Sequence, residues 1–369
     1  MHRLIHSILL LAISTLSAFA ESAVELRYAE NFAIQEFDTH RILTIRNTHA
    51  ATDKTLQYAL VSKSAPLPEL DNKISVIRTP IERVVAMETV YIGYLNALDA
   101  LDTIVGAGTT DYISNAAVKA RIESKAIHSV QVGQGLDIER MLLLQPEVIF
   151  TSISGDPAFD VPAKLTRSGL PVVLTAGYME SHPLARAEWI KYIAAFFEAD
   201  ELADARFTEI EANYTALQAK VADASSKPTV FCGAPYSGSW HVAGGESYTA
   251  RAIRDAGGDY LWSDVPQSGA LALDTERVFL KAANADIWIN PSFFRSMAEL
   301  LTAETRFNKF KAAQTGAVFN NTKQVGTNGG NAIWEQGIVH PDKVLADMIA
   351  IFHPDLMQDH DFVFYQQLK

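Results

Sequence analysis

The sequence predicts an α/β protein of two Rossmann-like lobes with central parallel sheets, joined by one long bridging helix and preceded by a β-rich extension. Short apolar strands alternate with helices from Arg83 onward, and this alternation stops at one long helical segment and starts again beyond Pro228. Such alternation is typical of βαβ units and parallel sheets. The pattern Leu-Asp-x-Glu-Arg also occurs twice, at 136–140 and 273–277. One copy in each half indicates two similar lobes, because solenoid repeats recur every ~20 to 50 residues.

The first twenty residues predict a secretory signal peptide. They contain Arg3, an apolar stretch from 8 to 16 and an A-x-A cleavage site at 18–20. The apolar stretch is too short to span a bilayer. The single cysteine, Cys232, is far from the cleavage site, where a lipid-anchoring cysteine would have to be, and we expect it to pack in a strand. We therefore expect a periplasmic protein that is not lipid-anchored.

Composition excludes some classes of partner. The chain has 369 residues, 48% of them hydrophobic, which is enough for two domains with ordinary cores. Its net charge of -12 argues against nucleic acid and anionic membranes as partners, because both attract basic surfaces. We expect a soluble acidic protein.

The extension is predicted to cover residues 21–80, after the signal peptide. Four short runs there alternate in part between apolar and polar residues and are separated by polar turns. This is typical of half-buried strands. The predicted strands cover residues 24–29, 32–37, 41–47 and 56–62.

The first lobe is predicted to cover residues 81–199. Its expected strands cover 83–87, 103–108, 130–133, 147–152 and 171–177, and its expected helices cover 90–101, 137–145 and 159–169. A further helix should begin at His182-Pro183, because proline is well tolerated in the first turn of a helix.

The bridging helix is predicted over 200–223. Its apolar residues are spaced by three and four positions and form one narrow stripe: Phe207, Ile210, Tyr214, Leu217 and Val221. About 22 residues of helix reach roughly 33 Å, the width of a small domain. The second lobe then covers 224–369, with strands expected at 229–235 and 285–290, a Gly/Ser-rich loop at 236–247, and helices at 248–258 and 273–283.

Together these features resemble the substrate-binding proteins of ATP-driven importers for ferric siderophores, haem and vitamin B12. The resemblance covers most of 81–353 and includes the phrases LDIERMLLLQPEVIF, IRDAGGDYLW and GIVHPDKVLADMIAIFHPDL. It implies a protein that holds a metal chelate between its lobes and delivers it to a permease dimer with ATPase subunits. A ferric siderophore or similar iron chelate is the first expectation, and haem or cobalamin is the alternative. The extension is longer than the shorter members of this group carry, and we expect it to pack on the first lobe.

Candidate ligand-binding residues follow from the position of strand ends. Ligands of α/β lobes bind where the carboxyl ends of strands converge, and here that region is a cleft between lobes. Aromatic faces suit a chelate wrapped in an organic ligand, and an arginine suits its carboxylate or catecholate oxygens. The candidates are Glu88, Tyr91, Tyr112, Tyr236, Trp240, Phe294, Arg295 and Trp334.

Structural roles are the alternative for these residues. The aromatic side chains could pack loops onto their own lobe, and Tyr91 could belong to the core of a helix. Glu88 could cap the helix that follows it. Trp240 and Trp334, in Gly-rich segments, are predicted to contact the ligand.

Neither a metal site nor a catalytic site is predicted. The sequence has no cysteine pair and no His-rich loop, and His182 and His340 precede prolines at helix starts, where capping or surface roles are expected. Metallocluster enzymes and chelatases share two-lobed sheets of this kind, so an enzyme is the rival class. The chain lacks G-x-S-x-G, H-E-x-x-H and phosphate-loop motifs, so we predict no catalytic residue and no cofactor besides the chelate that it would carry.

The repeated pattern predicts a pair of surface glutamates. Glu139 and Glu276 occupy matching positions near the start of a helix, where the helix dipole stabilises a carboxylate. One interpretation is a helix-start device used twice, with Asp137 and Asp274 as N-caps. The resemblance implies more, since in that group one glutamate per lobe docks onto arginines of the membrane subunits.

Overall fold

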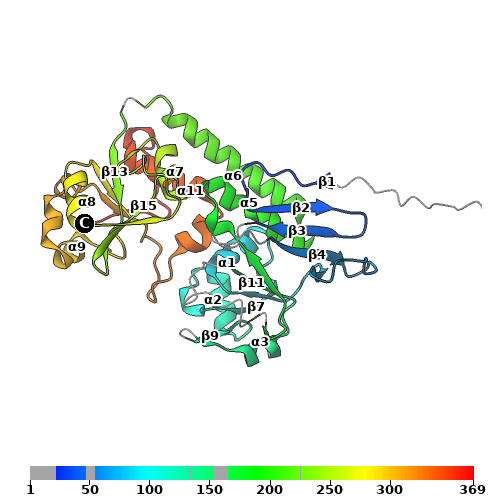
Figure 1. Ribbon diagram of the computed structural model, residues 1–369. Helices are drawn as coiled ribbons and strands as arrows, with labels where there is room; N and C mark the ends of the chain where they lie inside the picture. The colour runs from blue at the N-terminus through cyan, green and yellow to red at the C-terminus, as the bar shows by residue number, and fades with distance from the viewer. Residues whose placement is uncertain (1–21, 47–54, 133–134, 153–164, 166, 225) are drawn as a thin grey trace, which may run out of the picture.

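The structure is a computed structural model that describes residues 22–46, 55–132, 135–152, 165, 167–224 and 226–369. It has two α/β lobes, a long helix that joins them and a β-sheet extension beside the first lobe (Figure 1). This confirms the predicted fold class. The predicted signal peptide and most of the helix predicted over 159–169 lie outside the described residues.

The first lobe is built around a five-stranded parallel sheet. From edge to edge it contains β12 (Val172–Thr175), β11 (Val148–Ser152), β6 (Val84–Ala86), β7 (Ile104–Ala107) and β8 (His128–Ser129). Apart from β8, these strands confirm the predicted ones; the run predicted over 130–133 instead gives β9 (Gln131–Val132), which pairs with β10 (Gly135–Leu136). Its helices are α1 (Thr89–Ala97), α2 (Ala116–Glu123), α3 (Ile138–Leu144) and α5 (Pro183–Ala194).

The second lobe contains a mixed five-stranded sheet and a smaller antiparallel one. The larger sheet has the order β16 (Asp259–Tyr260), β13 (Thr229–Cys232), β18 (Ile287–Ile289), β19 (Val318–Asn320) and β20 (Gln366–Gln367), and only β20 runs antiparallel. The smaller sheet consists of β14 (Ala234–Tyr236), β15 (Ser239–Ala243) and β17 (Ala270–Leu273). Its helices are α7 (Tyr248–Asp255), α8 (Thr275–Ala282), α9 (Met297–Ala303), α10 (Lys311–Gln314) and α11 (Pro341–Phe352).

The predicted Gly/Ser-rich loop is largely a β-hairpin, so that prediction is wrong. Ser237 and Gly238 both have positive φ, at 50° and 87°, and join β14 to β15 by a two-residue turn. Turns with positive φ at both central residues match the twist of hairpin strands. The hairpin therefore turns Trp240 into the core while its neighbour His241 stays exposed.

The bridging helix is α6 (Asp200–Val221), close to its predicted bounds. Its first half packs on α5 of the first lobe, and its buried residues include Phe207, Ile210 and Tyr214, as the apolar stripe predicts. Its second half holds the second lobe: the Tyr214 hydroxyl donates to Asp255 over 2.9 Å, and α11 packs beside it.

The extension is a five-stranded sheet with the order β1 (Ser22–Ala23), β2 (Phe32–Glu36), β3 (Arg41–Ile45), β4 (Leu56–Ser62) and β5 (Ser75–Thr79). The sheet is antiparallel except between β4 and β5. It packs on the first lobe, as expected, and also reaches α6, where Arg41 lies 2.7 Å from Asp200 and Tyr28 donates to Glu211 over 2.8 Å.

Residues 24–29 do not form the predicted strand. The Glu188 carboxylate, fully buried on α5, accepts hydrogen bonds of 2.8 Å from the backbone N–H groups of Arg27, Tyr28 and Ala29. These donors serve a side chain from the first lobe rather than a neighbouring strand, so residues 27–29 are anchored without joining the sheet, while Val24 N still donates to the Ile34 carbonyl oxygen of β2 over 3.0 Å.

A segment of the second half of the chain reaches back to the first lobe. This segment is a turn of π-helix, η6 (Ile333–Gly337), and it lies beside α1. In Figure 1 the C-terminal part of the chain, which includes η6, is coloured orange to red. A Cβ on Gly93 would lie 1.9 Å from the Glu335 carbonyl oxygen, so α1 needs glycine for this approach. Glu335 also accepts from Ser114 N over 2.7 Å. The remaining short turns are η1 (Leu101–Thr103), η2 (Thr110–Tyr112), η3 (Gly177–Met179), η4 (Ala195–Phe197), η5 (Thr305–Lys309) and η7 (Pro354–Leu356).

Candidate functional site

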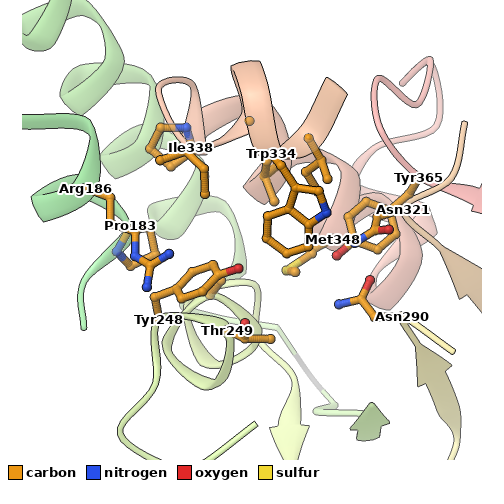
Figure 2. A pocket seen from close by; sticks show the side chains of 15 residues that line it. Pro183, Arg186, Tyr248, Thr249, Asn290, Asn321, Trp334, Ile338, Met348 and Tyr365 are labelled. Atoms are coloured by element: carbon orange, nitrogen blue, oxygen red, sulfur yellow. The ribbon is translucent and has the colours of Figure 1, made fainter. Parts of the chain in front are cut away.

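Three adjoining pockets lie between the lobes, and Arg186 lines all of them. The first is bounded by α5, α7, η6 and α11, and Figure 2 shows the Trp334 and Tyr248 rings facing its interior. The second extends into the first lobe beside Tyr91 and Thr175. The third opens along the second-lobe hairpin at His241. Side chains from both lobes therefore enclose one continuous interlobe site.

Arg186 is the cation at the centre of this site. It lies in the first turn of α5, directly after the loop that follows β12, and Nε donates to the carbonyl oxygen of Glu180 over 3.1 Å. A second guanidinium nitrogen donates to the Tyr178 carbonyl oxygen. These backbone acceptors orient the guanidinium without neutralising its charge.

No carboxylate forms a salt bridge with Arg186 within the described ranges. Burial lowers the pKa of the Arg186 guanidinium. The nearby Glu180 carboxylate is engaged elsewhere, since it accepts from Asn31 N over 3.0 Å and from Trp189 Nε1 over 3.1 Å. The half-buried charge of Arg186 is therefore available to an anionic group in the cleft.

Tyr248 supplies an aromatic face from the opposite lobe. It opens α7 directly after the N-cap Ser247, whose hydroxyl accepts from Ala250 N over 3.1 Å. The Arg186 Cζ atom lies 3.6 Å from the centroid of the Tyr248 ring, a cation–π contact across the cleft. The pair brings a positive charge and an aromatic surface to one spot.

Trp334 is an exposed aromatic residue of the cleft. It lines two of the pockets and is 48% exposed, whereas the four other tryptophans, all within the described residues, are buried. Asn331 holds its turn, since the Asn331 carbonyl oxygen accepts from Trp334 N over 3.1 Å and Oδ1 accepts from Ile333 N over 3.2 Å. An indole ring that is half-exposed inside a cleft can stack on a flat ligand.

A polar group closes the first-lobe end of the site. Glu88 Oε1 accepts from the Thr151 hydroxyl, the Ser152 hydroxyl and Ser152 N at 3.1–3.3 Å, and Ser152 lines the pocket. Burial raises the pKa of Glu88 to about 7, although these hydrogen bonds oppose the shift. The Tyr91 hydroxyl is 2.9 Å from Thr175 Oγ1, and burial followed by the nearby Glu88 charge raises its pKa. Glu88 occupies the N-cap position of α1 but its side chain makes no capping hydrogen bond, which argues against the alternative capping role.

The predicted ligand-binding residues divide into two groups. Tyr91 and Trp334 line the interlobe site, and Glu88 borders it through Ser152. Five others line none of the three pockets. Tyr112 and Tyr236 are exposed, Phe294 packs partly against the core, Arg295 is exposed and donates to the Gly326 carbonyl oxygen over 3.3 Å, and Trp240 is fully buried.

Trp240 belongs to the core of the second lobe. Its ring is surrounded by Trp288, Phe307 and Phe310, and Nε1 donates to the Cys232 carbonyl oxygen over 3.1 Å. The predicted ligand contact is therefore wrong for this residue, because the β15 alternation turns its side chain inward. Cys232 is also buried, as expected.

Arg186 and Tyr248 are site residues that the sequence patterns did not identify. Both lie in the first turn of a helix that follows a strand end, Arg186 one turn into the helix opened by His182-Pro183. A search of helix first turns, as well as strand-end loops, would have found both.

The histidines before prolines differ in role. His182 caps α5, with Nδ1 accepting from Leu184 N over 3.0 Å, whereas His340 makes no side-chain cap to α11. Burial lowers the pKa of His340 to about 4. No group of three or more potential metal-ligating residues occurs in the described part of the chain.

The repeated pattern places two glutamates on the surface. Asp137 and Asp274 cap α3 and α8 by accepting from Arg140 N and Glu276 N, both over 2.9 Å, which confirms their predicted N-cap role. Glu139 and Glu276 are both exposed. Glu276 lies 2.6 Å from Arg306.

Comparison with known proteins gives the same architecture. A solved periplasmic heme-binding protein of Pseudomonas aeruginosa is similar with a TM-score of 0.59 and 16% identity over 78% of this chain and 98% of that one. A possible iron-binding, periplasmic solute-binding protein of Staphylococcus epidermidis is similar with a TM-score of 0.57 and 18% identity over 74% and 99%. An uncharacterized lipoprotein of Methanocaldococcus jannaschii is 26% identical over 327 residues, 84% of this chain and 75% of that protein.

The family assignment rests on the sequence as well as the fold. The family described as periplasmic binding protein matches residues 84–325, which span both lobes and α6. Members of this family work with the permease and ATPase subunits of ATP-driven importers. In the described residues, no helix is long and apolar enough to cross a membrane. The chain belongs to the periplasmic binding protein family.

Proposed function

We propose that this protein captures an anionic iron chelate, first of all a ferric siderophore, in the interlobe site and delivers it to the permease of an importer. The observation that carries this proposal is Arg186, a half-buried guanidinium in the cleft that forms no ion pair with a carboxylate of the described residues. A cation that has lost part of its hydration is stabilised by an anion, so a ligand with carboxylate or catecholate oxygens would pair with it.

The other walls of the site suit the organic shell of such a ligand. Tyr248 and Trp334 present aromatic faces from the second-lobe side, and Pro183 and Ile338 add apolar surface. Asn290 and Asn321 contribute amide groups that can hydrogen-bond to ligand oxygens. The chelate is cargo rather than a resident cofactor, and the protein contributes recognition without catalysis.

Haem is the second candidate, because its two propionates are anionic and its flat ring can stack on Trp334 or Tyr248. The similarity to a heme-binding protein supports this alternative. Cobalamin ranks below it, since cyanocobalamin carries no net charge to pair with Arg186. A metallocluster enzyme or chelatase remains the rival class. An enzyme of that class would convert its substrate into a product, whereas a binding protein releases its ligand unchanged.

The test is a ligand titration of the purified mature protein. Native mass spectrometry would first identify any ligand that copurifies. Tryptophan fluorescence would then be titrated with ferric enterobactin, ferric citrate, haemin and cyanocobalamin. Saturable quenching by a ferric siderophore supports the proposal, quenching by haemin alone supports the alternative, and no response to the anionic chelates contradicts the class.

We also propose that the mature protein diffuses freely in the periplasm and docks through Glu139 and Glu276. A relative from Methanocaldococcus jannaschii is named as a lipoprotein. A lipid anchor of that kind is attached to a cysteine, and the one cysteine of this sequence, Cys232, is buried in the second lobe. Cell fractionation tests this directly: recovery in the osmotic-shock fluid supports free diffusion, and recovery with detergent-extracted membranes contradicts it.

A further inference from the structure

The two copies of the repeated pattern present the same exposed apolar side chain. Leu143 lies four residues after Glu139 in α3, and Leu280 lies four residues after Glu276 in α8. Their exposed fractions are 83% and 84%, the highest for leucines in the described part of the chain. Inward positions match as well, since Met141 and Val278 are both fully buried. The two helices therefore turn equivalent faces toward the core and toward solvent.

Residues four apart lie on the same face of a helix, so each leucine is next to its glutamate. Each lobe thus displays a carboxylate beside an isobutyl group. A single exposed leucine needs no explanation on a protein surface. Two of them at equivalent positions of a repeat, in lobes whose sheets differ in topology, indicate that both copies face the same kind of partner.

We infer that Leu143 and Leu280 are docking residues that insert into apolar depressions on the two related membrane subunits of the importer. This inference rests on the proposed function and adds the apolar half of each contact. The negative charge beside each leucine requires a basic side chain at the rim of each depression. In Figure 1, α3 and α8 lie at the ends of different lobes, so each would meet a different membrane subunit.

The two contacts differ in their electrostatics. Glu276 already has an ion-pair partner, Arg306, at 2.6 Å, and Arg306 also lies 3.0 Å from Glu304. Glu139 forms no ion pair with any other described residue. The first-lobe contact therefore combines charge and burial, while the second-lobe contact depends mainly on Leu280.

Photocrosslinking in cells identifies the partner. The full chain would carry benzoylphenylalanine at position 143, 280 or, as a control, 67, because Leu67 is a 66%-exposed leucine of the extension. Crosslinks from 143 and 280, but not from 67, to the permease subunits are expected. Crosslinks only to other copies of this chain, or equal labelling from position 67, would overturn the inference.

Affinity then separates this inference from the docking role of the glutamates. The permease complex would be placed in nanodiscs and titrated with wild type, with Leu143→Ser plus Leu280→Ser, with Leu67→Ser and with Glu139→Arg plus Glu276→Arg. Losing both leucines should weaken binding at least about tenfold, with an unchanged melting temperature, since buried leucines contribute strongly to association. If only the double glutamate variant binds the permease complex more weakly, the inference about the leucines is wrong and the proposed docking through Glu139 and Glu276 stands. If neither double variant binds more weakly, both the inference and the proposed docking are wrong.

Discussion

The Arg186 guanidinium lies 3.6 Å from the centroid of the Tyr248 ring, although the two residues belong to different lobes. A ligand bound beside this pair would contact both lobes. Arg186→Gln should therefore weaken binding of ferric enterobactin by about 2–4 kcal/mol, because the anion loses its cationic partner. Fluorescence titration measures this loss.

The control for that substitution is Arg295→Gln. Arg295 is exposed and lies outside the three pockets of the interlobe site, so its loss should leave affinity within twofold. Equal effects of the two substitutions would mean that the acceptor of the anion lies elsewhere. A Lys at position 186 should restore part of the affinity, since charge remains but the planar donor pair is lost.

Trp334 and Trp240 should separate affinity from stability. Trp334→Ala should weaken ligand binding by about 1–3 kcal/mol and remove most of the ligand-induced quenching, because Trp334 is the exposed tryptophan of the cleft. Trp240→Ala should instead lower the free energy of unfolding by about 3–5 kcal/mol, because it empties a core site. Urea unfolding and titration of both variants check this. If Trp240→Ala instead weakened ligand binding and left the free energy of unfolding unchanged, Trp240 would be a ligand-binding residue.

Glu88 should make stability depend on pH. Its pKa is about 7 in the folded protein against an ordinary 4.5, and burial is the main cause. A carboxyl with a raised folded pKa holds its proton longer when folded, so the free energy of unfolding should fall as pH rises from about 4.5 to about 7. The fall should total roughly 3 kcal/mol. Glu88→Gln should remove it.

Urea unfolding of wild type and Glu88→Gln at pH 4 and pH 8 tests the sign. The variant should match wild type at pH 4 and exceed it at pH 8. Glu123→Gln, an exposed position of the same lobe, should leave the pH dependence unchanged. Parallel curves for wild type and Glu88→Gln would mean that Glu88 titrates normally.

Glu139→Arg together with Glu276→Arg should abolish import in cells while ligand affinity and melting temperature remain intact. Reversed charges would repel the basic groups expected on the membrane subunits. Growth on the ferric chelate as the sole iron source measures import. Glu123→Arg together with Glu201→Arg, two exposed glutamates of other helices, should have no effect. Normal growth of the first double variant would mean that the repeated pattern serves only to start helices.

Glu188 should anchor the extension. Glu188→Ala leaves three backbone N–H groups without their acceptor, so unfolding should cost roughly 3 kcal/mol less than in wild type. The extension should also become the first site of limited proteolysis. The exposed Glu201→Ala is the matched control. Unchanged protease resistance would show that the sheet contacts alone hold the extension.

The lobes and α6 could be predicted because their signals are local and repeated. Apolar runs for β6, β11 and β18 are flanked by helix patterns, and α6 carries its apolar stripe over many turns. The strand predicted over 24–29 failed for a non-local reason. Its N–H groups are taken by Glu188, more than a hundred residues away in the sequence.

The site was less accessible to sequence reasoning. Tyr91 and Trp334 are aromatic residues in the segments that follow β6 and β19, a position that predicts ligand contact, whereas a lone arginine one turn into α5 resembles any solvated residue. Trp240 was misplaced because glycines and serines suggested a loop, although the turn residues make a hairpin whose alternation turns the indole inward. Which face of a short strand is buried depends on the sheet that covers it.

At Gly93, α1 touches the Glu335 carbonyl oxygen of η6, and a Cβ at this position has no room. A larger side chain at position 93 would therefore push η6 away from α1. Because Trp334 lies in η6 and lines two of the pockets, such a displacement would move one wall of the interlobe site. A position that contacts no ligand thus sets the width of the cleft.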